Sequence, residues 1–157
     1  TVGNSWTIQQ IHSEPDTMLR TRISTSFVSG VAYLEGVAWY AVGDGYYGYL
    51  ARNTGEGYVI SFSNEPNEDN KLRYKYPAEV GDYWDDGFNK THVVSVTETV
   101  KVKAGVFSDC ILYRSTDIHP EDLFEIWIKP GVGYVKSISY RYGEVDQVYE
   151  LMEYNLE

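Results

Sequence analysis

The chain has 157 residues, 43% of them hydrophobic, and carries 13 Lys and Arg against 23 Asp and Glu, a formal net charge of −10 at pH 7. This composition excludes intrinsic disorder and suits one domain with a buried core. The negative charge disfavours nucleic acid and anionic membranes as partners, and no apolar run approaches the ~20 residues of a transmembrane helix.

Segments rich in Val, Ile, Tyr, Trp and Thr, separated by turn residues, predict a chain made of β-strands. In chain order, strands are expected at 5–12, 18–28, 31–35, 37–42, 46–52, 57–63, 71–76, 94–103, 106–116, 123–129, 133–142 and 145–154. At most one helical turn is expected, in 14–19 or 120–123. Short connections favour antiparallel neighbours. The predicted fold is therefore all-β: an antiparallel meander that forms a strongly curved sheet or a partial or closed β-barrel.

The segment from 94 to 103 has the two-residue alternation of a half-buried strand. Val94, Val96, Val100 and Val102 are expected to share one face, and Glu98 falls on that same apolar face. We expect a sheet edge or a β-bulge at Glu98, with an active-site carboxylate as the alternative.

Two short motifs recur in the same order. Val2–Trp6 resembles Val80–Trp84, 78 positions later, and Gly55–Ser63 matches Gly131–Ser139, 76 positions later, at six of nine positions. These matches indicate one domain over 1–157 built from two similar halves of about 77 residues, 1–77 and 78–157. Convergent turn-then-strand chemistry is the alternative explanation.

The C-terminal stretch 144–157 contains five acidic residues and no Lys or Arg. Charged side chains on a sheet edge discourage pairing between molecules. The stretch is therefore expected to form the charged outer face of a strand.

Three segments, Pro77–Trp84, Lys103–Cys110 and Trp127–Lys136, together resemble a bacterial secreted or lipoprotein-type β domain with the pattern V-G-x-x-W, A-G-x-F and G-V-G-x-V-K. The resemblance covers most of the chain. It implies a curved antiparallel sheet similar to lipoprotein-carrier half-barrels or lipocalin-like barrels. It also implies an extracytoplasmic protein that is secreted, periplasmic or lipid-anchored through an upstream cysteine. It carries over no catalytic residue.

Motifs for nucleotide binding, nucleophilic catalysis and metal binding are absent. His12, His92 and His119 lack the spacing of metal ligands, and the single Cys110 reads as a small buried hydrophobe. No cofactor and no metal site is predicted.

Clustered carboxylates leave one weak calcium candidate, Asp82, Asp85 and Asp86, which also suit a solvated turn. A second acidic cluster, Glu65, Glu68 and Asp69, reads in the same way. A hydrolase that uses such loop carboxylates is the least favoured function.

Aromatic residues are the most suggestive feature, because 15% of the chain is Phe, Trp or Tyr. One face of the sheet must form the core, and the other is able to bind a ligand. We predict a non-catalytic extracytoplasmic protein that binds a small apolar molecule or lipid, with Trp39, Tyr47, Trp84 and Trp127 lining its concave face. The alternative is a protein-interaction or structural module that binds an envelope protein.

Overall fold

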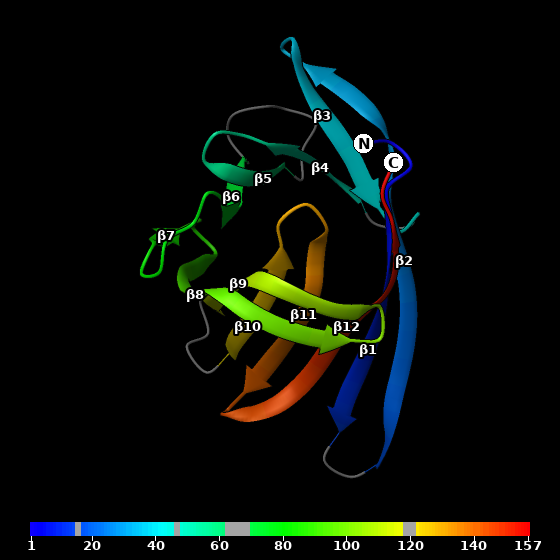
Figure 1. The fold of residues 1–157 in the computed structure, drawn as a ribbon, viewed down its shortest axis with the longest axis vertical. Coiled ribbons are helices and arrows are strands. Elements are labelled where there is room, and N and C mark those ends of the chain that lie inside the picture. The colour runs from blue at the N-terminus through cyan, green and yellow to red at the C-terminus, as the bar shows by residue number, and fades with distance from the viewer. Residues whose placement is uncertain (15–16, 46–47, 62–69, 118–121) are drawn as a thin grey trace. The chain divides into compact units, whose positions relative to one another are not determined.

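A computed structural model describes residues 1–14, 17–45, 48–61, 70–117 and 122–157 (Figure 1). Every regular element in these ranges is a β-strand, as the sequence predicts. Residues 17–19 and 122–123 belong to strands, so neither expected helical turn is seen in the described residues. The described part of the chain contains no helix with the length and apolarity to cross a membrane.

In the described residues, twelve strands form one antiparallel sheet. They are β1 (Ser5–Glu14), β2 (Thr17–Leu34), β3 (Val37–Gly43), β4 (Gly48–Asn53), β5 (Gly57–Ser61), β6 (Lys71–Lys75), β7 (Tyr83–Asp85), β8 (Asn89–Val102), β9 (Gly105–Asp117), β10 (Asp122–Lys129), β11 (Gly133–Arg141) and β12 (Glu144–Asn155). The sheet does not close into a barrel, and its order is β6-β5-β4-β3-β2-β1-β12-β11-β10-β9-β8-β7. The predicted curved meander is confirmed.

Two strand predictions need correction. The strands expected at 18–28 and 31–35 are the single strand β2, because the pairing with β3 skips one residue between Val28 and Gly30 and then continues. A bulge of this kind interrupts the alternation without ending the strand. β7 was not predicted, since three residues give too little pattern to detect.

The acid-rich C-terminal stretch was placed wrongly. It forms β12, which lies inside the sheet between β1 and β11. Its carboxylates therefore do not protect an edge. The two edges are β6, which has Lys or Arg at alternate positions, and the three-residue β7. Cationic residues and very short strands are both known protections for a sheet edge.

The chain divides into two compact units. The first comprises 1–6, 25–77 and 155–157, and the second comprises 7–24 and 78–154. Their boundaries differ from those of the predicted halves. The division into one domain with two repeats stays a prediction.

The first unit has an apolar core on one face of its strands. Val28, Val42, Ala51 and Ile60 are buried there, and aromatic side chains, including Tyr58, pack against them. The hydroxyl of Tyr58 donates a hydrogen bond to that of Tyr49 at 3.3 Å, and burial is the main cause that raises the pKa of Tyr58. The hydrogen bond between Tyr58 and Tyr49 joins β5 to β4 beside this core.

The second unit is a rolled sheet. The backbone N–H of Ala104, in the turn between β8 and β9, donates to the carbonyl of Leu151 on β12 at 3.0 Å. The rings of Phe107 and Tyr154 lie 5.9 Å apart on the same two strands, β9 and β12. Figure 1 shows the β8–β9 hairpin running across the direction of β10 and β11. Because β10 and β11 separate β9 from β12 in the sheet order, these contacts require strong curvature.

The bulge expected at Glu98 is confirmed. The pairing of β8 with β9 shifts on both sides of Glu98. Burial on β8 changes parity there: Val93 is buried before the shifts, whereas Val100 and Val102 are buried after them. The prediction that Val94 shares the buried face with Val100 is therefore wrong, because the intervening irregularities reverse the alternation.

The recurring V-G-x-x-W motif makes the same backbone contacts in both places. In each copy the motif glycine has a positive φ, +97° at Gly3 and +93° at Gly81. Each copy also makes the same three backbone hydrogen bonds. In the first copy, the N–H of Gly3 donates to Val28 O, that of Val28 to Asn4 O, and that of Asn4 to Thr1 O. In the second copy, the N–H of Gly81 donates to Val93 O, that of Val93 to Asp82 O, and that of Asp82 to Glu79 O. The two copies of the motif therefore share a local structure, and the repeat itself stays a prediction.

Gly57 opens β5 with a φ of +141°, and a Cβ atom there would lie 2.1 Å from the carbonyl oxygen of Tyr74. Gly57→Ala should therefore lower the free energy of unfolding by about 2 kcal/mol or more. Gly55→Ala is the matched control, because a Cβ at Gly55 meets nothing within 4 Å. Urea unfolding of both variants tests this; equal midpoints would contradict it.

Candidate functional site

The strand register of the second unit places two rows of side chains on one face of the sheet. Residues opposite each other on neighbouring strands point to the same face, and alternate residues along a strand do so too. The first row is Val93, Tyr113, Ile126, Ser137 and Tyr149. The second row is Trp84, Thr91, Ser115, Phe124, Ser139 and Gln147. We call these eleven residues the inner face.

The inner face combines aromatic and aliphatic side chains with hydroxyl and amide groups, and none of its eleven residues is charged. Val93 and Tyr113 are each 1% exposed. Thr91, Ser115 and Ser139 are buried as well. This face therefore contributes to the core, yet it keeps an unusual number of hydrogen-bonding groups for a core surface.

Hydrogen bonds organise the polar groups of the inner face. The hydroxyls of Thr91 and Ser115 share one at 2.9 Å. At the β12 end, Gln10 of β1 donates from Nε2 to Gln147 Oε1 at 2.8 Å and to the hydroxyl of Tyr149 at 3.1 Å. The Tyr149 hydroxyl in turn donates to Gln147 Oε1. Burial, and then the nearby Asp146, raise the pKa of Tyr149, which keeps its hydroxyl protonated as a donor.

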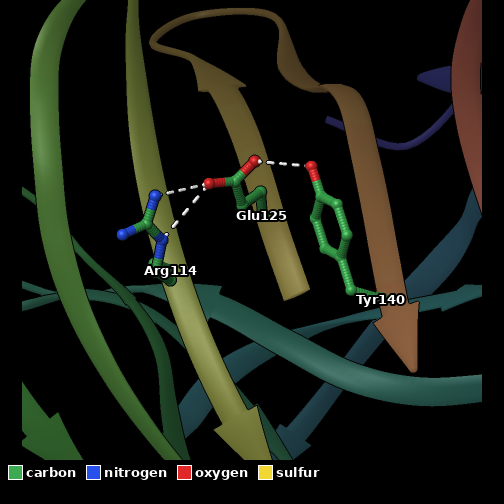
Figure 2. Close-up of polar contacts among 3 residues, drawn as sticks. All are labelled: Arg114, Glu125 and Tyr140. Atoms are coloured by element: carbon green, nitrogen blue, oxygen red, sulfur yellow. Dashed lines mark hydrogen bonds and ion pairs between the residues drawn. The ribbon is translucent and has the colours of Figure 1, made fainter. Parts of the chain in front are cut away.

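The opposite face, which we call the outer face, carries charged side chains. Arg114 donates to Glu125 Oε1 from Nη2 at 2.6 Å and from Nε at 3.2 Å. The Tyr140 hydroxyl donates to Glu125 Oε2 at 3.1 Å. Figure 2 shows Arg114 and Tyr140 reaching the two oxygens of this carboxylate from opposite sides. Burial, and then the contact with Glu125, raise the pKa of Tyr140.

A second cross-strand ion pair lies on the outer face. Lys136 Nζ is 3.0 Å from Glu150 Oε1, and these two residues face each other across β11 and β12. His92 is the register partner of Arg114 and so shares the outer face with it. The eleven inner-face residues are uncharged, but an ion pair borders them at the same parity: Asp122 and Arg141 are register partners on β10 and β11, with Arg141 Nε 3.5 Å from Asp122 Oδ1.

The four aromatic residues predicted to line a ligand site do not come together on one surface. Trp84 lies on the inner face and packs edge-on against Tyr113, with ring centroids 5.9 Å apart. Trp127 is the register partner of Leu112 and Lys136, which places it on the outer face.

The other two predicted aromatic residues lie elsewhere. Trp39 is in the first unit, 1% exposed, with the guanidinium of Arg52 4.7 Å from its ring centroid. This contact packs Trp39 beneath a cation. Tyr47 lies outside the described residues. Only Trp84 of the four is placed on the inner face, and ligand binding by any of them stays a prediction.

The three carboxylates of the calcium candidate accept hydrogen bonds from nearby backbone groups. Asp82 Oδ2 accepts from the N–H of Glu79 and Asp85 Oδ1 from that of Gly87, both at 2.8 Å. Asp86 Oδ1 accepts from two successive N–H groups, those of Phe88 and Asn89.

These bonds build the turns on either side of β7, the role typical of Asp in loops. Within the described ranges, no group of three or more His, Cys, Asp or Glu residues is arranged to hold a metal. Glu65, Glu68, Asp69 and His119 lie outside those ranges.

Sequence reasoning missed the polar members of the inner face. Ser137 and Ser139 follow one another at two-residue spacing, and Gln147 and Tyr149 repeat that spacing on the next strand. This alternation was the available signal. It could not show that the two pairs face each other, because that depends on the bulged register between β11 and β12.

Comparison with known proteins identifies the fold. The chain is similar to the crystal structure of a Bacteroides fragilis protein predicted to be exported, which has a YmcC-like fold; the TM-score is 0.61 at 19% identity, over 99% of this chain and 97% of the other. A second similar structure, a predicted lipoprotein from Parabacteroides distasonis, gives a TM-score of 0.46 at 13% identity, over 99% and 96%. No protein-family model matches the chain, and no curated protein matches it significantly. The first likeness shows that the two proteins share a fold.

The buried Thr91–Ser115 pair can be tested by a double-mutant cycle. Thr91→Val or Ser115→Ala alone leaves one buried hydroxyl without its partner, and each should cost about 1–3 kcal/mol of stability. The double variant should cost less than the sum, because it removes both hydroxyls together. Strict additivity in urea unfolding would show that the two hydroxyls do not depend on each other.

Proposed function

We propose that this chain is an exported, non-catalytic binding protein whose inner face holds an uncharged small molecule that has both apolar and hydrogen-bonding groups. One observation carries the proposal: eleven register-aligned residues of a rolled sheet combine aromatic, aliphatic, hydroxyl and amide side chains without a charge. Sites for small molecules typically have this composition, in which apolar contacts supply affinity and a few polar groups fix the orientation.

The absence of charge on the inner face narrows the ligand class. An ionic group brought against the eleven inner-face residues, away from the Asp122–Arg141 pair at their border, would lose its hydration without gaining a counter-charge, which is strongly unfavourable. A neutral molecule does not incur that cost. We therefore favour a neutral lipid or another uncharged amphipathic compound over a phosphate or carboxylate ligand.

The hydroxyl and amide groups refine the expectation of a small apolar molecule or lipid. Ser137, Gln147 and Tyr149 are only half-buried, so a molecule lying on this face would contact them. Their polar groups already bond within the protein, Ser137 with Tyr134 and Gln147 with Gln10, Tyr149 and Asp146. An amphipathic ligand would use their remaining donor and acceptor capacity while its apolar part contacts Trp84 and Phe124.

The arrangement of charges supports a non-catalytic role. Glu125 is the carboxylate with the most hydrogen bonds among the outer-face ion pairs, and both of its oxygens are engaged by Arg114 and Tyr140. It also lies on the face opposite the proposed ligand. General acid–base chemistry requires the acid or base to reach the reacting atom, within ~3 Å or through one water. None of the eleven inner-face residues is a carboxylate or a histidine, and Asp122, which borders them on β10, is paired with Arg141.

Export is supported by the fold and by the resemblance in the sequence. The similar B. fragilis structure belongs to a protein predicted to be exported, and the V-G-x-x-W, A-G-x-F and G-V-G-x-V-K motifs resemble those of secreted or lipid-anchored bacterial domains. We propose that this chain also works outside the cytoplasm, as a secreted, periplasmic or lipid-anchored protein.

Recognition of an envelope protein is the second candidate function, favoured by the hairpin of β2 and β3. Val31, Tyr33 and Tyr40 share one face of this hairpin and are all exposed, Tyr33 at 74%. Exposed aromatic residues of this kind are enriched at protein interfaces.

Native mass spectrometry of the detergent-free protein, beside the same sample denatured, tests ligand binding. A retained neutral compound should appear as extra mass that is lost on denaturation, and extraction should give an uncharged amphipathic molecule. The double variant Ser137→Val with Gln147→Leu should retain several-fold less of it, because both changes remove hydrogen-bonding groups from the inner face.

Thr116→Val is the matched control, since its register partners Lys90 and Leu123 place it on the outer face. Its occupancy should equal that of the unmodified protein. A bare 17.9 kDa chain, or a ligand that both variants retain equally, would contradict the assignment to the inner face.

Fractionation of cells that express the natural precursor tests export. The protein should appear in the periplasmic, membrane or secreted fraction, with a soluble cytoplasmic enzyme as the control for lysis. Recovery together with the cytoplasmic marker would contradict this part of the proposal.

A further inference from the structure

The strands of the first unit have a second face, opposite the core of Val28, Val42, Ala51 and Ile60. Residues opposite each other on neighbouring strands share a face, and so do alternate residues along a strand. The register therefore places one set of side chains on this second face: Trp39, Ala41, Leu50, Arg52, Val59, Ser61 and Leu72. We call this set the Trp39 face.

Arg52 is the one charged member of the Trp39 face, and it has no counter-charge in the described part of the chain. Its guanidinium lies 4.7 Å from the ring centroid of Trp39. Neither a hydrogen bond nor an ion pair joins it to a described residue, and its Nε atom is buried without a hydrogen-bond partner. Buried polar side-chain atoms normally have a partner, so this cation is incompletely compensated.

The contact with Trp39 positions the guanidinium without using its N–H groups. Trp39 is 1% exposed, so packing on all sides holds its ring in place. The ring face attracts the cation electrostatically, while the N–H donors stay available for hydrogen bonds. Arg52 as a whole is only half-buried, and its Nη groups, unlike Nε, are not buried. A molecule lying on the Trp39 face is therefore able to reach them.

We propose that the Trp39 face binds an organic monocarboxylate, whose carboxylate pairs with Arg52 and whose apolar part lies on Leu50, Val59 and Leu72. The planar end of a guanidinium donates parallel hydrogen bonds to both oxygens of a carboxylate, so the two groups match in charge and in shape. This site belongs to the first unit and is separate from the inner face, which belongs to the second.

The charges favour a monoanion over a phosphate. One guanidinium neutralises one negative charge, and no other member of the Trp39 face is a cation. A phosphate monoester is close to a dianion at neutral pH, so it would bring an uncompensated charge onto this face. The net charge of −10 on the chain also repels a dianion more strongly than a monoanion.

The neighbours of Arg52 favour an apolar body for the ligand. Leu50, Val59 and Leu72 are half-buried, so each has apolar surface that a ligand would cover. Covering that surface supplies affinity, while the ion pair with Arg52 fixes the orientation.

Octanoate, octanol and octyl phosphate are matched probes, because they share one alkyl chain and differ in the charge of the head group. Nitrogen–proton correlation spectra of the arginine Nε–H groups, recorded while the unmodified protein is titrated, report on the site directly. The Arg52 signal is assigned by its absence from the spectrum of Arg52→Lys. Octanoate should shift this signal saturably, whereas octanol should leave it in place. Octyl phosphate, and acetate, which lacks the chain, should bind more weakly.

Isothermal titration calorimetry of variants with octanoate gives the contribution of Arg52. Arg52→Gln should weaken binding about tenfold or more, because it removes hydrogen bonds to a charged group. Arg52→Lys keeps the charge without the planar pair of donors, so its affinity should fall between the two. Arg22→Gln is the matched control: it removes the same charge at an exposed position of β2 and should leave binding unchanged. Urea unfolding verifies that each variant is folded.

The proposal is overturned by an Arg52 signal that octanoate does not shift, by octanol that shifts it as octanoate does, or by Arg52→Gln that binds octanoate like the unmodified protein. Tighter binding of octyl phosphate, or equal binding of acetate, would overturn the choice of ligand. The inner-face variant Ser137→Val with Gln147→Leu should bind octanoate unchanged. The two ligand-binding proposals therefore stand or fail separately.

Discussion

The two-residue alternation of the β-strand, carried from strand to strand by the register, determines the chemistry of the second unit. Once a side chain on β8 points to one face of the sheet, its cross-strand partners on β9 to β12 point to the same face. The hydroxyl and amide groups of Thr91, Ser115, Ser137, Ser139 and Gln147 share one side, the Arg114–Glu125 and Lys136–Glu150 pairs lie on the other, and aromatic residues occur on both. A slip of one residue anywhere in this ladder would exchange the two sets. The position of these two ion pairs is thus a consequence of the pairing as much as of the composition.

Much of the fold was predictable because turn residues mark where strands end. Eleven of the twelve strands coincide with segments rich in β-branched and aromatic residues, two of which merge into β2. The strand order was not predictable in the same way. β1 beside β12 is a pairing between the two ends of the chain, and local pattern carries no information about it. For this reason the expectation that the C-terminal carboxylates protect a sheet edge was wrong.

The sequence predicted an aromatic-rich surface but not which residues form it. Whether Trp84 and Trp127 share a face depends on the number of residues between them and on the register of every strand pair between their two strands. Trp84 reaches the inner face through its pairing with Thr91, while Trp127 falls on the other parity of β10. Bulges add a further difficulty: at Glu98 the alternation changes phase, so that Val93 and Val100 are both buried at an odd separation. Sequence reasoning found this bulge only because a carboxylate stood out among valines.

The position of the chain ends has a consequence for folding. The N–H of Glu157 donates to Asn4 Oδ1 at 2.9 Å, so the first and last residues are neighbours. Read from β7, the sheet order is seven to twelve and then one to six, a plain meander interrupted only by the termini. A circular permutant that joins residue 157 to residue 1 and opens between β6 and β7 would have only sequential strands as neighbours. Its contact order would be lower, and proteins with lower contact order fold faster. The natural order instead leaves β1 without one neighbour until the end of the chain is available.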